Sequence, residues 1–157
     1  MPPHDDIKKY RFKATTRVRM SQTDIVGIVN NIRFFDFIEI GRFEYFRDMG
    51  LRYADMKDYG VSMALLESSC RYLSPLYFDE VIEIYTRIDY IGDSSFQVRY
   101  LIYVPERDIV VAEGKTASIF LGIESRKPIK IPDELKRKIV DYEDGKNIRT
   151  KDSSVSD

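Results

Sequence analysis

The clearest pattern along the chain is an alternation of apolar and polar residues. Residues 11–20, 81–91 and 96–104 place an apolar side chain at nearly every second position. A period of two with one apolar face is typical of a half-buried strand. Residues 61–74 and 109–121 predict two further strands. Short turns, Gly92-Asp93-Ser94 and Glu106-Arg107-Asp108, separate the later strands and predict that they are antiparallel neighbours.

A helical period governs the segment from Ile32 to about Met49. Asn30 or Asn31 is a suitable N-cap, and Gly50 is a suitable residue to follow the last turn. Phe37, Ile40 and Phe43 interrupt its polar face. One broad apolar face contains Phe34, Phe35, Ile38, Gly41, Tyr45, Phe46 and Met49. A helix that is apolar nearly all round is usually buried on several sides, so we expect a central helix whose start is also buried.

The order of elements is therefore strand, long helix, four strands, and a short helix from Pro132 to about Val140. This order predicts an α+β fold, in which a five-stranded antiparallel sheet wraps around one long helix, with a short C-terminal helix. The predicted limits are an N-terminal extension over residues 1–10, one domain over residues 11–141 and a polar, disordered tail over residues 142–157. Because such a sheet leaves strand edges open, we expect a homodimer, or a homotetramer formed as a dimer of dimers.

Composition and charge narrow the class of protein. With 157 residues, 43% of them hydrophobic, the chain can build one real core. Its 25 basic and 26 acidic residues create no global field that favours nucleic acid or an anionic membrane. No stretch approaches the roughly 20 apolar residues of a membrane span, and the N-terminus lacks the apolar run of a signal peptide. One cysteine, Cys70, allows no intrachain disulfide, which predicts a cytoplasmic protein.

The scarcity of histidine limits the possible chemistry. His4 and Cys70 are the only residues of their types, so the chain lacks an ordinary zinc-ligand set. A Ser-His-Asp or Cys-His system would need His4 to fold back from the N-terminus into a site. We therefore expect hydrolytic chemistry to depend on carboxylates, without a metal or cofactor.

The loop that precedes the long helix contains the main candidate. Asp24 lies seven residues before Asn31, where the predicted helix begins. The first turn of a helix has N–H groups without intrahelical partners, and its dipole is positive there. A carboxylate beside such donors can act on a carbonyl while the donors hold the oxyanion, which indicates an enzyme acting on acyl groups. The alternatives are an ordinary turn aspartate and asparagines that serve only as caps.

Three blocks in this order resemble a known family. The first contains Thr23-Asp24, Gly27, Val29-Asn30-Asn31, Phe34-Phe35, Glu39 and Arg42. The second contains Glu67, Arg71-Tyr72-Leu73-Ser74-Pro75 and Asp79, and the third contains Ala112-Glu113-Gly114 and the segment from Lys127 to Pro132. Together they cover roughly residues 11–135. The chain resembles the hotdog-fold acyl-CoA thioesterases, specifically the 4-hydroxybenzoyl-CoA thioesterase-like family, which implies the hotdog fold.

The resemblance assigns roles to the candidate catalytic residues. It implies hydrolysis of acyl-CoA to free acid and coenzyme A, which takes part only as a portion of the substrate. Asp24 would act as nucleophile or general base, and the backbone N–H of Asn31 would polarise the thioester carbonyl. Glu39 is the reserve carboxylate, because a second hotdog subfamily uses a glutamate on this helix. An i,i+3 pair with Arg42 is the alternative for Glu39.

The same resemblance indicates substrate-binding residues. These are Gly27, Val29 and Asn30 in the loop, with Glu67 and Tyr72 on the following strand, for which a cross-strand pair is the alternative. The cluster Arg126, Lys127 and Lys130 either meets coenzyme A phosphates or forms a solvated turn.

One departure from the family concerns Ile28, where many relatives have a histidine or a small residue after the glycine. This departure affects the expected acyl specificity more than the reaction. A thioesterase acting on acyl carrier protein and a non-catalytic hotdog protein that binds acyl thioesters remain as alternatives.

Overall fold

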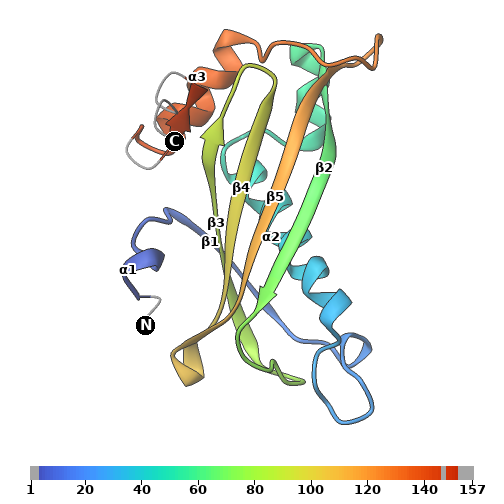
Figure 1. Ribbon diagram of the computed structural model, residues 1–157, viewed down its shortest axis with the longest axis vertical. Coiled ribbons are helices and arrows are strands. Elements are labelled where there is room, and N and C mark those ends of the chain that lie inside the picture. The colour runs from blue at the N-terminus through green and yellow to red at the C-terminus, as the bar shows by residue number, and fades with distance from the viewer. Residues whose placement is uncertain (1–3, 146–147, 152–157) are drawn as a thin grey trace. The chain divides into compact units, whose positions relative to one another are not determined.

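The computed structural model describes residues 4–145 and 148–151 (Figure 1). Short 3₁₀ helices occupy Met20–Gln22, Asn31–Arg33, Tyr53–Tyr59 and Pro105–Arg107. The other elements, in chain order, are α1 (His4–Ile7), β1 (Phe12–Arg17), α2 (Phe34–Asp48), β2 (Val61–Tyr72), β3 (Val81–Ile91), β4 (Ser95–Val104), β5 (Ile109–Gly122), α3 (Asp133–Tyr142) and β6 (Arg149–Thr150). The strands, the long helix and the short C-terminal helix that the periodicity predicts are all present.

The sheet has the hydrogen-bonded order β1-β3-β4-β5-β2, with β6 beside β3. Strands β1 and β3 pair antiparallel, from Phe12 opposite Thr86 to Arg17 opposite Val81. The predicted α+β fold, an antiparallel sheet with one long helix, is confirmed. The predicted disordered tail differs from the structure at Arg149–Thr150, which pairs in parallel with Tyr90 and Ile91 of β3. Residues 1–3, 146–147 and 152–157, which the extension and tail predictions also include, lie outside the described residues.

Close contacts divide the chain into two compact units. Unit 1 consists of Met1–Tyr45, Ser69–Arg87 and Tyr100–Gly114. Unit 2 consists of Phe46–Ser68, Ile88–Arg99 and Lys115–Asp157.

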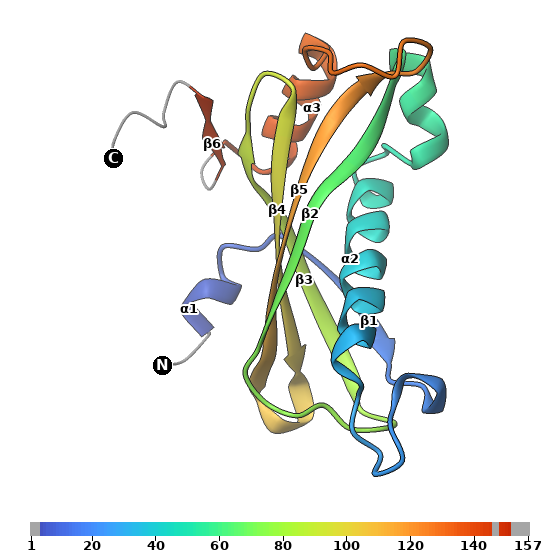
Figure 2. The ribbon, with the colours of Figure 1, turned by 45° about the vertical axis from the view of Figure 1, so that its right-hand side comes forward.

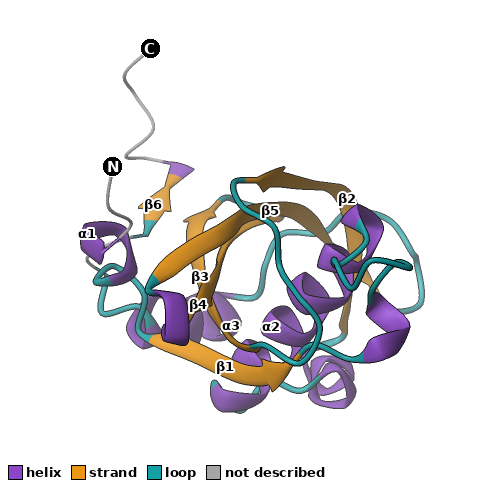
Figure 3. Ribbon diagram, turned by 90° about the horizontal axis from the view of Figure 1, so that it is seen from below, coloured by secondary structure: helices purple, strands orange, loops and turns teal. Residues whose placement is uncertain are grey.

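In unit 1 the first turns of α2 pack against the sheet beside β1 and β3 (Figures 2 and 3). Gly41 permits the close approach. A Cβ atom at this position would lie 2.6 Å from Cγ2 of Ile84 and 2.7 Å from Oγ1 of Thr86. The ring of Tyr45, fully buried, meets Phe12 of β1 edge to face at 5.8 Å. The helix is thus held to the sheet by large apolar side chains around one small residue.

Two expectations about the helix need correction. The wheel placed Phe35 on the buried face and Phe37 among the polar residues, whereas Phe37 is fully buried and Phe35 is half-buried. The start of the helix is not buried either, because no residue of the 3₁₀ turn Asn31–Arg33 is buried and burial begins at Phe34. The sheet covers only one side of α2, so aromatic side chains elsewhere on the helix stay partly exposed.

Unit 2 has its own apolar centre. Phe96 of β4 contacts Phe46 of α2 at 5.8 Å and Phe120 of β5 at 5.0 Å between ring centroids. Helix α3 buries Leu135 and Ile139, as expected for an amphipathic helix.

Candidate active site

Asp24 stands in a tight loop that its own carboxylate organises. Its Oδ1 atom accepts hydrogen bonds from the N–H groups of Val26, at 2.9 Å, and Ile28, at 3.1 Å. Gly27 takes a φ of +80°, which other residues resist, and its N–H donates to the Asp24 carbonyl. The second oxygen of Asp24, Oδ2, accepts no hydrogen bond within residues 4–145 and 148–151. Asp24 is therefore held as a turn aspartate, with one exposed oxygen still available.

The loop is fixed to the segment that joins β2 to β3. The N–H of Val29 donates to the Leu76 carbonyl at 2.8 Å, and the N–H of Phe78 donates to the Gly27 carbonyl at 2.9 Å. The N–H of Asn30 donates to the Gln22 carbonyl at 3.0 Å. The backbones of Gly27 and Val29 thus tie the loop to the segment after β2, and the backbone of Asn30 ties its end to Gln22. These three residues are among those predicted to bind substrate.

The helix start offers a backbone donor, the N–H of Asn31. Asn30 has the extended conformation of an N-cap, φ −61° and ψ 136°, and its side chain accepts from the N–H of Ile32 at 3.0 Å. The carbonyl of Asn30 accepts from the N–H of Arg33. The N–H of Asn31 donates to no group in the described part of the chain. This amide lies at the positive end of the α2 dipole, where it can stabilise a developing negative charge.

Tyr72, at the end of β2, reaches the same turn. Its hydroxyl donates to the carbonyl of Asn31 at 2.8 Å, and its ring meets Phe34 edge to face at 5.1 Å. Partial burial and the neighbouring Cys70 raise the pKa of the Tyr72 hydroxyl, so it stays protonated and able to donate. Tyr72 therefore anchors the helix start from the strand, a role beyond the binding role predicted for it.

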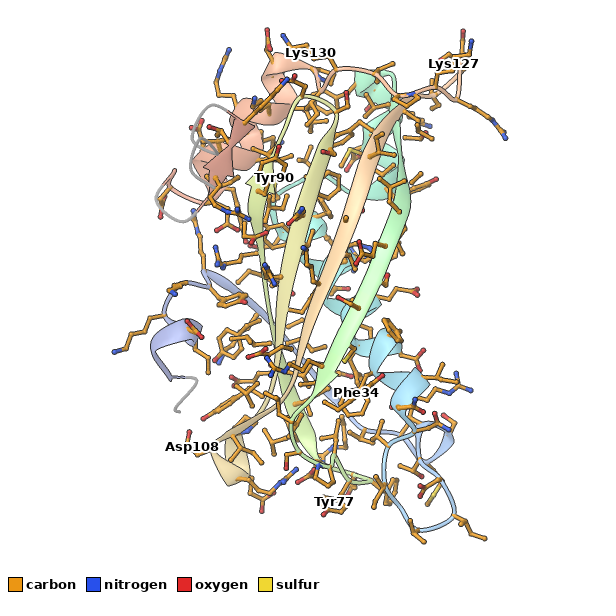
Figure 4. The ribbon with its side chains drawn as sticks, viewed as in Figure 1. Phe34, Tyr77, Tyr90, Asp108, Lys127 and Lys130 are labelled. Carbon is orange, nitrogen blue, oxygen red and sulfur yellow. The ribbon has the colours of Figure 1, made fainter. Side chains whose placement is uncertain are left out.

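Between these elements lies an open cavity of about 370 Å³. Its walls are Ile28 and Val29 of the loop, Asn31 and Phe34 of the helix start, and residues 72–76. In Figure 4, Phe34 lies beside the end of β2, above Tyr77 of the following segment. The cavity combines apolar walls with Asn31, whose N–H has no partner within the described residues. Asp24 does not line it, but Ile28, which does, donates its N–H to the Asp24 carboxylate.

An ion pair that the sequence analysis did not identify holds one wall of the cavity. Arg107 donates to both carboxylate oxygens of Glu80, at 2.7 and 2.8 Å, and to the Pro75 carbonyl at 3.0 Å. Its guanidinium lies 5.3 Å from the centre of the Tyr77 ring, and the Tyr77 N–H donates to Glu80. We call the Arg107–Glu80 pair the clamp. Neither residue belongs to a recognisable motif, and they are 27 residues apart in the chain.

The other predicted site residues lie elsewhere. Glu39 is exposed and lines a separate polar cavity with Arg17, Arg19 and Asp36, so the structure does not bring it to the Asn31 cavity. The alternative of an ion pair between Glu39 and Arg42 is also absent from the described residues, where the Arg42 guanidinium lies over the Phe43 ring.

Two further predictions concern unit 2. Glu67 is exposed on β2 and does not line the cavity. Arg126, Lys127 and Lys130 are exposed on the turn after β5, where Lys127 and Lys130 project outward (Figure 4).

Within the described residues, His, Cys, Asp and Glu side chains form no group of three that could hold a metal ion. None of the described helices is both long and apolar enough to cross a membrane.

Comparison with known proteins adds an independent result. Residues 18–139 match the family described as the thioesterase-like superfamily. A protein of Aquifex aeolicus named as a candidate esterase is 31% identical over 119 residues, covering 76% of this chain and 90% of that protein. A 1,4-dihydroxy-2-naphthoyl-CoA hydrolase of Microcystis aeruginosa is 25% identical over 120 residues, covering 76% of this chain and 86% of that protein.

Solved structures agree with the fold. The crystal structure of a hypothetical protein from Aquifex aeolicus has a TM-score of 0.74 at 30% identity, covering 82% of this chain and 98% of that chain. A 1,4-dihydroxy-2-naphthoyl-CoA thioesterase from Synechocystis has a TM-score of 0.75 at 18% identity, covering 83% of this chain and 96% of that chain. At 18% identity the second likeness establishes the fold alone.

Proposed function

The chain belongs to the thioesterase-like superfamily, and on this premise we propose that it hydrolyses acyl-CoA thioesters to free acid and coenzyme A. The observation that carries the proposal is the Asn31 N–H, which is unpaired within the described residues, at a helix start, and beside an apolar cavity. Attack on a thioester carbonyl places negative charge on its oxygen, and a fixed amide donor stabilises that charge. Coenzyme A enters only as part of the substrate, and no bound cofactor is required.

Asp24 is the proposed catalytic carboxylate. It either attacks the carbonyl carbon itself or removes a proton from the attacking water. With water as the nucleophile, the tetrahedral intermediate collapses, the C–S bond breaks, and the proton that Asp24 took from the water passes to the departing thiolate. With Asp24 as the nucleophile, collapse releases the thiolate and leaves a mixed anhydride between the acyl group and Asp24. Water then cleaves this anhydride, which gives the free acid, restores the Asp24 carboxylate and supplies the proton for the thiolate. The two hydrogen bonds to Oδ1 hold the side chain in place and leave Oδ2 for the chemistry.

The substitution Asp24→Asn tests this role. The amide oxygen of asparagine can still accept from the N–H groups of Val26 and Ile28, so the loop should keep its conformation while the charge is lost. We expect thiol release from a panel of short, long and aromatic acyl-CoAs to fall by about 10²- to 10⁴-fold, with an unchanged melting temperature. Undiminished hydrolysis by Asp24→Asn would exclude the mechanism. Binding of acyl-CoA without turnover by the unaltered protein would instead indicate a non-catalytic hotdog protein.

The substitution Asn31→Pro tests the amide donor. Proline is favoured at the first helical position and lacks only an N–H that has no partner in the described residues. The extended conformation of Asn30 is the one that a residue before proline prefers. We expect turnover to fall by about 10²- to 10³-fold in Asn31→Pro. Asn31→Ala is the matched control, because it removes the side chain, keeps the N–H and should retain most of the activity.

We also propose that the enzyme is a homodimer, with a dimer of dimers as the alternative. Strand β2 ends the strand order of the sheet, and its Leu65 and Leu66 are 50% and 63% exposed in the single chain. Unpaired strand edges with exposed apolar side chains favour pairing with a second copy. Light scattering at micromolar concentration should give twice or four times the monomer mass, and a monomeric mass would contradict the proposal.

A further inference from the structure

Two separate segments cover the edge of β3 that faces away from β4. Strand β1 pairs with residues 81–86 of β3, and β6 pairs in parallel with Tyr90 and Ile91. Strand β4 follows β3 after a short turn and occupies the opposite edge. The end of β3 is therefore covered by a segment from the end of the chain, residues 149–151, which we call the strap.

The strap brings two cations to two carboxylates of unit 2. The Arg149 guanidinium lies 3.4 Å from Oδ2 of Asp89 and 5.7 Å from the centre of the Tyr90 ring. Lys151 forms an ion pair with Asp93, and this hydrogen bond lowers the pKa of the Asp93 carboxyl. Charge and backbone pairing thus hold the strap at one place on β3.

Asp89 depends on the strap for part of its pairing. Its side chain is only 8% exposed, and its Oδ2 atom accepts from Arg99 of β4 at 3.0 Å and from Arg149 at 3.4 Å. The other oxygen, Oδ1, is buried and has no hydrogen-bond partner within the described residues. A buried carboxylate is costly unless it is paired, so the Asp89 charge favours the position of Arg149 seen here.

We propose that the strap closes the edge of β3 through its two ion pairs, and that an open strap exposes this edge to the same edge of a second copy of the chain. Opening is local, because the strap contributes two residues of strand pairing and its Arg149 and Lys151 side chains are 56% and 62% exposed. An uncovered strand edge presents unpaired N–H and C=O groups to other strands. Two open copies present identical edges, which can pair across a two-fold axis.

Amide hydrogen exchange of the full chain tests the closure. Arg149→Glu places a second carboxylate beside Asp89, so exchange across Tyr90 and Ile91 should become roughly tenfold faster or more. Arg149→Lys keeps the charge and should retain most of the protection. The matched control is Arg137→Glu, which makes the same change of charge at an exposed position of α3. Exchange in Arg149→Glu as slow as in this control would overturn the closure.

The unaltered protein provides a second measurement that requires no variant to fold. Because both cations of the strap are more than half exposed, salt should screen their pairs with Asp89 and Asp93. We expect sodium chloride at about 1 M to accelerate exchange across Tyr90 and Ile91 severalfold relative to the amides of β4. An equal response of the two strands would overturn closure by these ion pairs.

Light scattering tests what the open edge binds. As its concentration rises, Arg149→Glu should reach twice the mass of the unaltered protein, whereas Arg137→Glu should not. Pairing of two edges should also slow exchange across Tyr90 and Ile91 again in the concentrated sample. A mass equal to that of the unaltered protein, or association without renewed protection at these residues, would overturn pairing with a second copy. Neither result depends on thioester hydrolysis.

Discussion

Removal of the Arg107 side chain should lower the free energy of unfolding far more than the loss of an ordinary surface ion pair does. The Arg107 and Glu80 side chains are only 30% and 14% exposed, and the guanidinium makes two hydrogen bonds to the carboxylate. Arg107→Met would leave the Glu80 carboxylate largely buried, with the Tyr77 N–H as its remaining donor within the described residues. Loss of one partner of a buried pair costs about 3–5 kcal/mol, and an exposed pair contributes at most about 1 kcal/mol.

Because the two side chains of the clamp are partly exposed, the expected loss of stability lies between these limits. We expect the free energy of unfolding of Arg107→Met to fall by about 2–3 kcal/mol. Glu80→Gln in the same background removes the uncompensated charge and keeps an acceptor for the Tyr77 N–H. The double variant should therefore recover part of the loss, with a coupling energy of about 1–2 kcal/mol.

Urea denaturation, monitored by circular dichroism and extrapolated linearly to water, measures these differences. Lys9→Met is the control, because Lys9 and Asp6 form an ion pair whose side chains are 52% and 60% exposed. This control should change the free energy of unfolding by less than about 0.5 kcal/mol. A loss in Arg107→Met no larger than in Lys9→Met, or strictly additive effects in the double variant, would refute the assignment of the clamp.

Two other predictions concern packing and pH. Gly41→Ala should lower the free energy of unfolding by about 1–2 kcal/mol, because the added Cβ would overlap the Ile84 and Thr86 side chains. The better helix propensity of alanine offsets only part of this strain. An unchanged or higher melting temperature would contradict the close approach of the helix to the sheet at Gly41. Burial raises the pKa of Cys70, an effect that the Tyr72 hydroxyl partly opposes, so alkylation by iodoacetamide should begin at higher pH in the native chain than in the urea-unfolded chain. The stability that this shift contributes is present below the unfolded cysteine pKa of about 8.5 and is lost as the pH rises through the native pKa; equal alkylation midpoints in the two states would contradict it.

Properties that depend on neighbouring residues could be predicted well. The alternation over residues 81–91 and 96–104 places Ile82, Ile84 and Val98 in the core, because successive side chains of a strand point to opposite faces. The sequence predicts Asn30 or Asn31 as the cap, and the side chain of Asn30 accepts from the helix start. The helix face was predicted less accurately, since Phe35 and Phe37 are both apolar and composition alone cannot decide which of them the sheet covers.

The cavity and the clamp depend on which distant segments meet. Ile28 and Leu73 line one cavity because the loop before α2 is hydrogen-bonded to the segment after β2, a pairing that depends on strand order. Glu39 has a helical position compatible with catalysis, but the fold places it at a different cavity.

The chain therefore encodes in its local pattern the strands, the long helix and the loop that carries Asp24, since these follow from periods of two and 3.6 residues and from turn preferences. The exposure of the helix start, the open cavity beside Asn31 and the pairing of Arg107 with Glu80 appear only in the folded protein. These features depend on contacts between residues far apart in the chain, which no local period specifies.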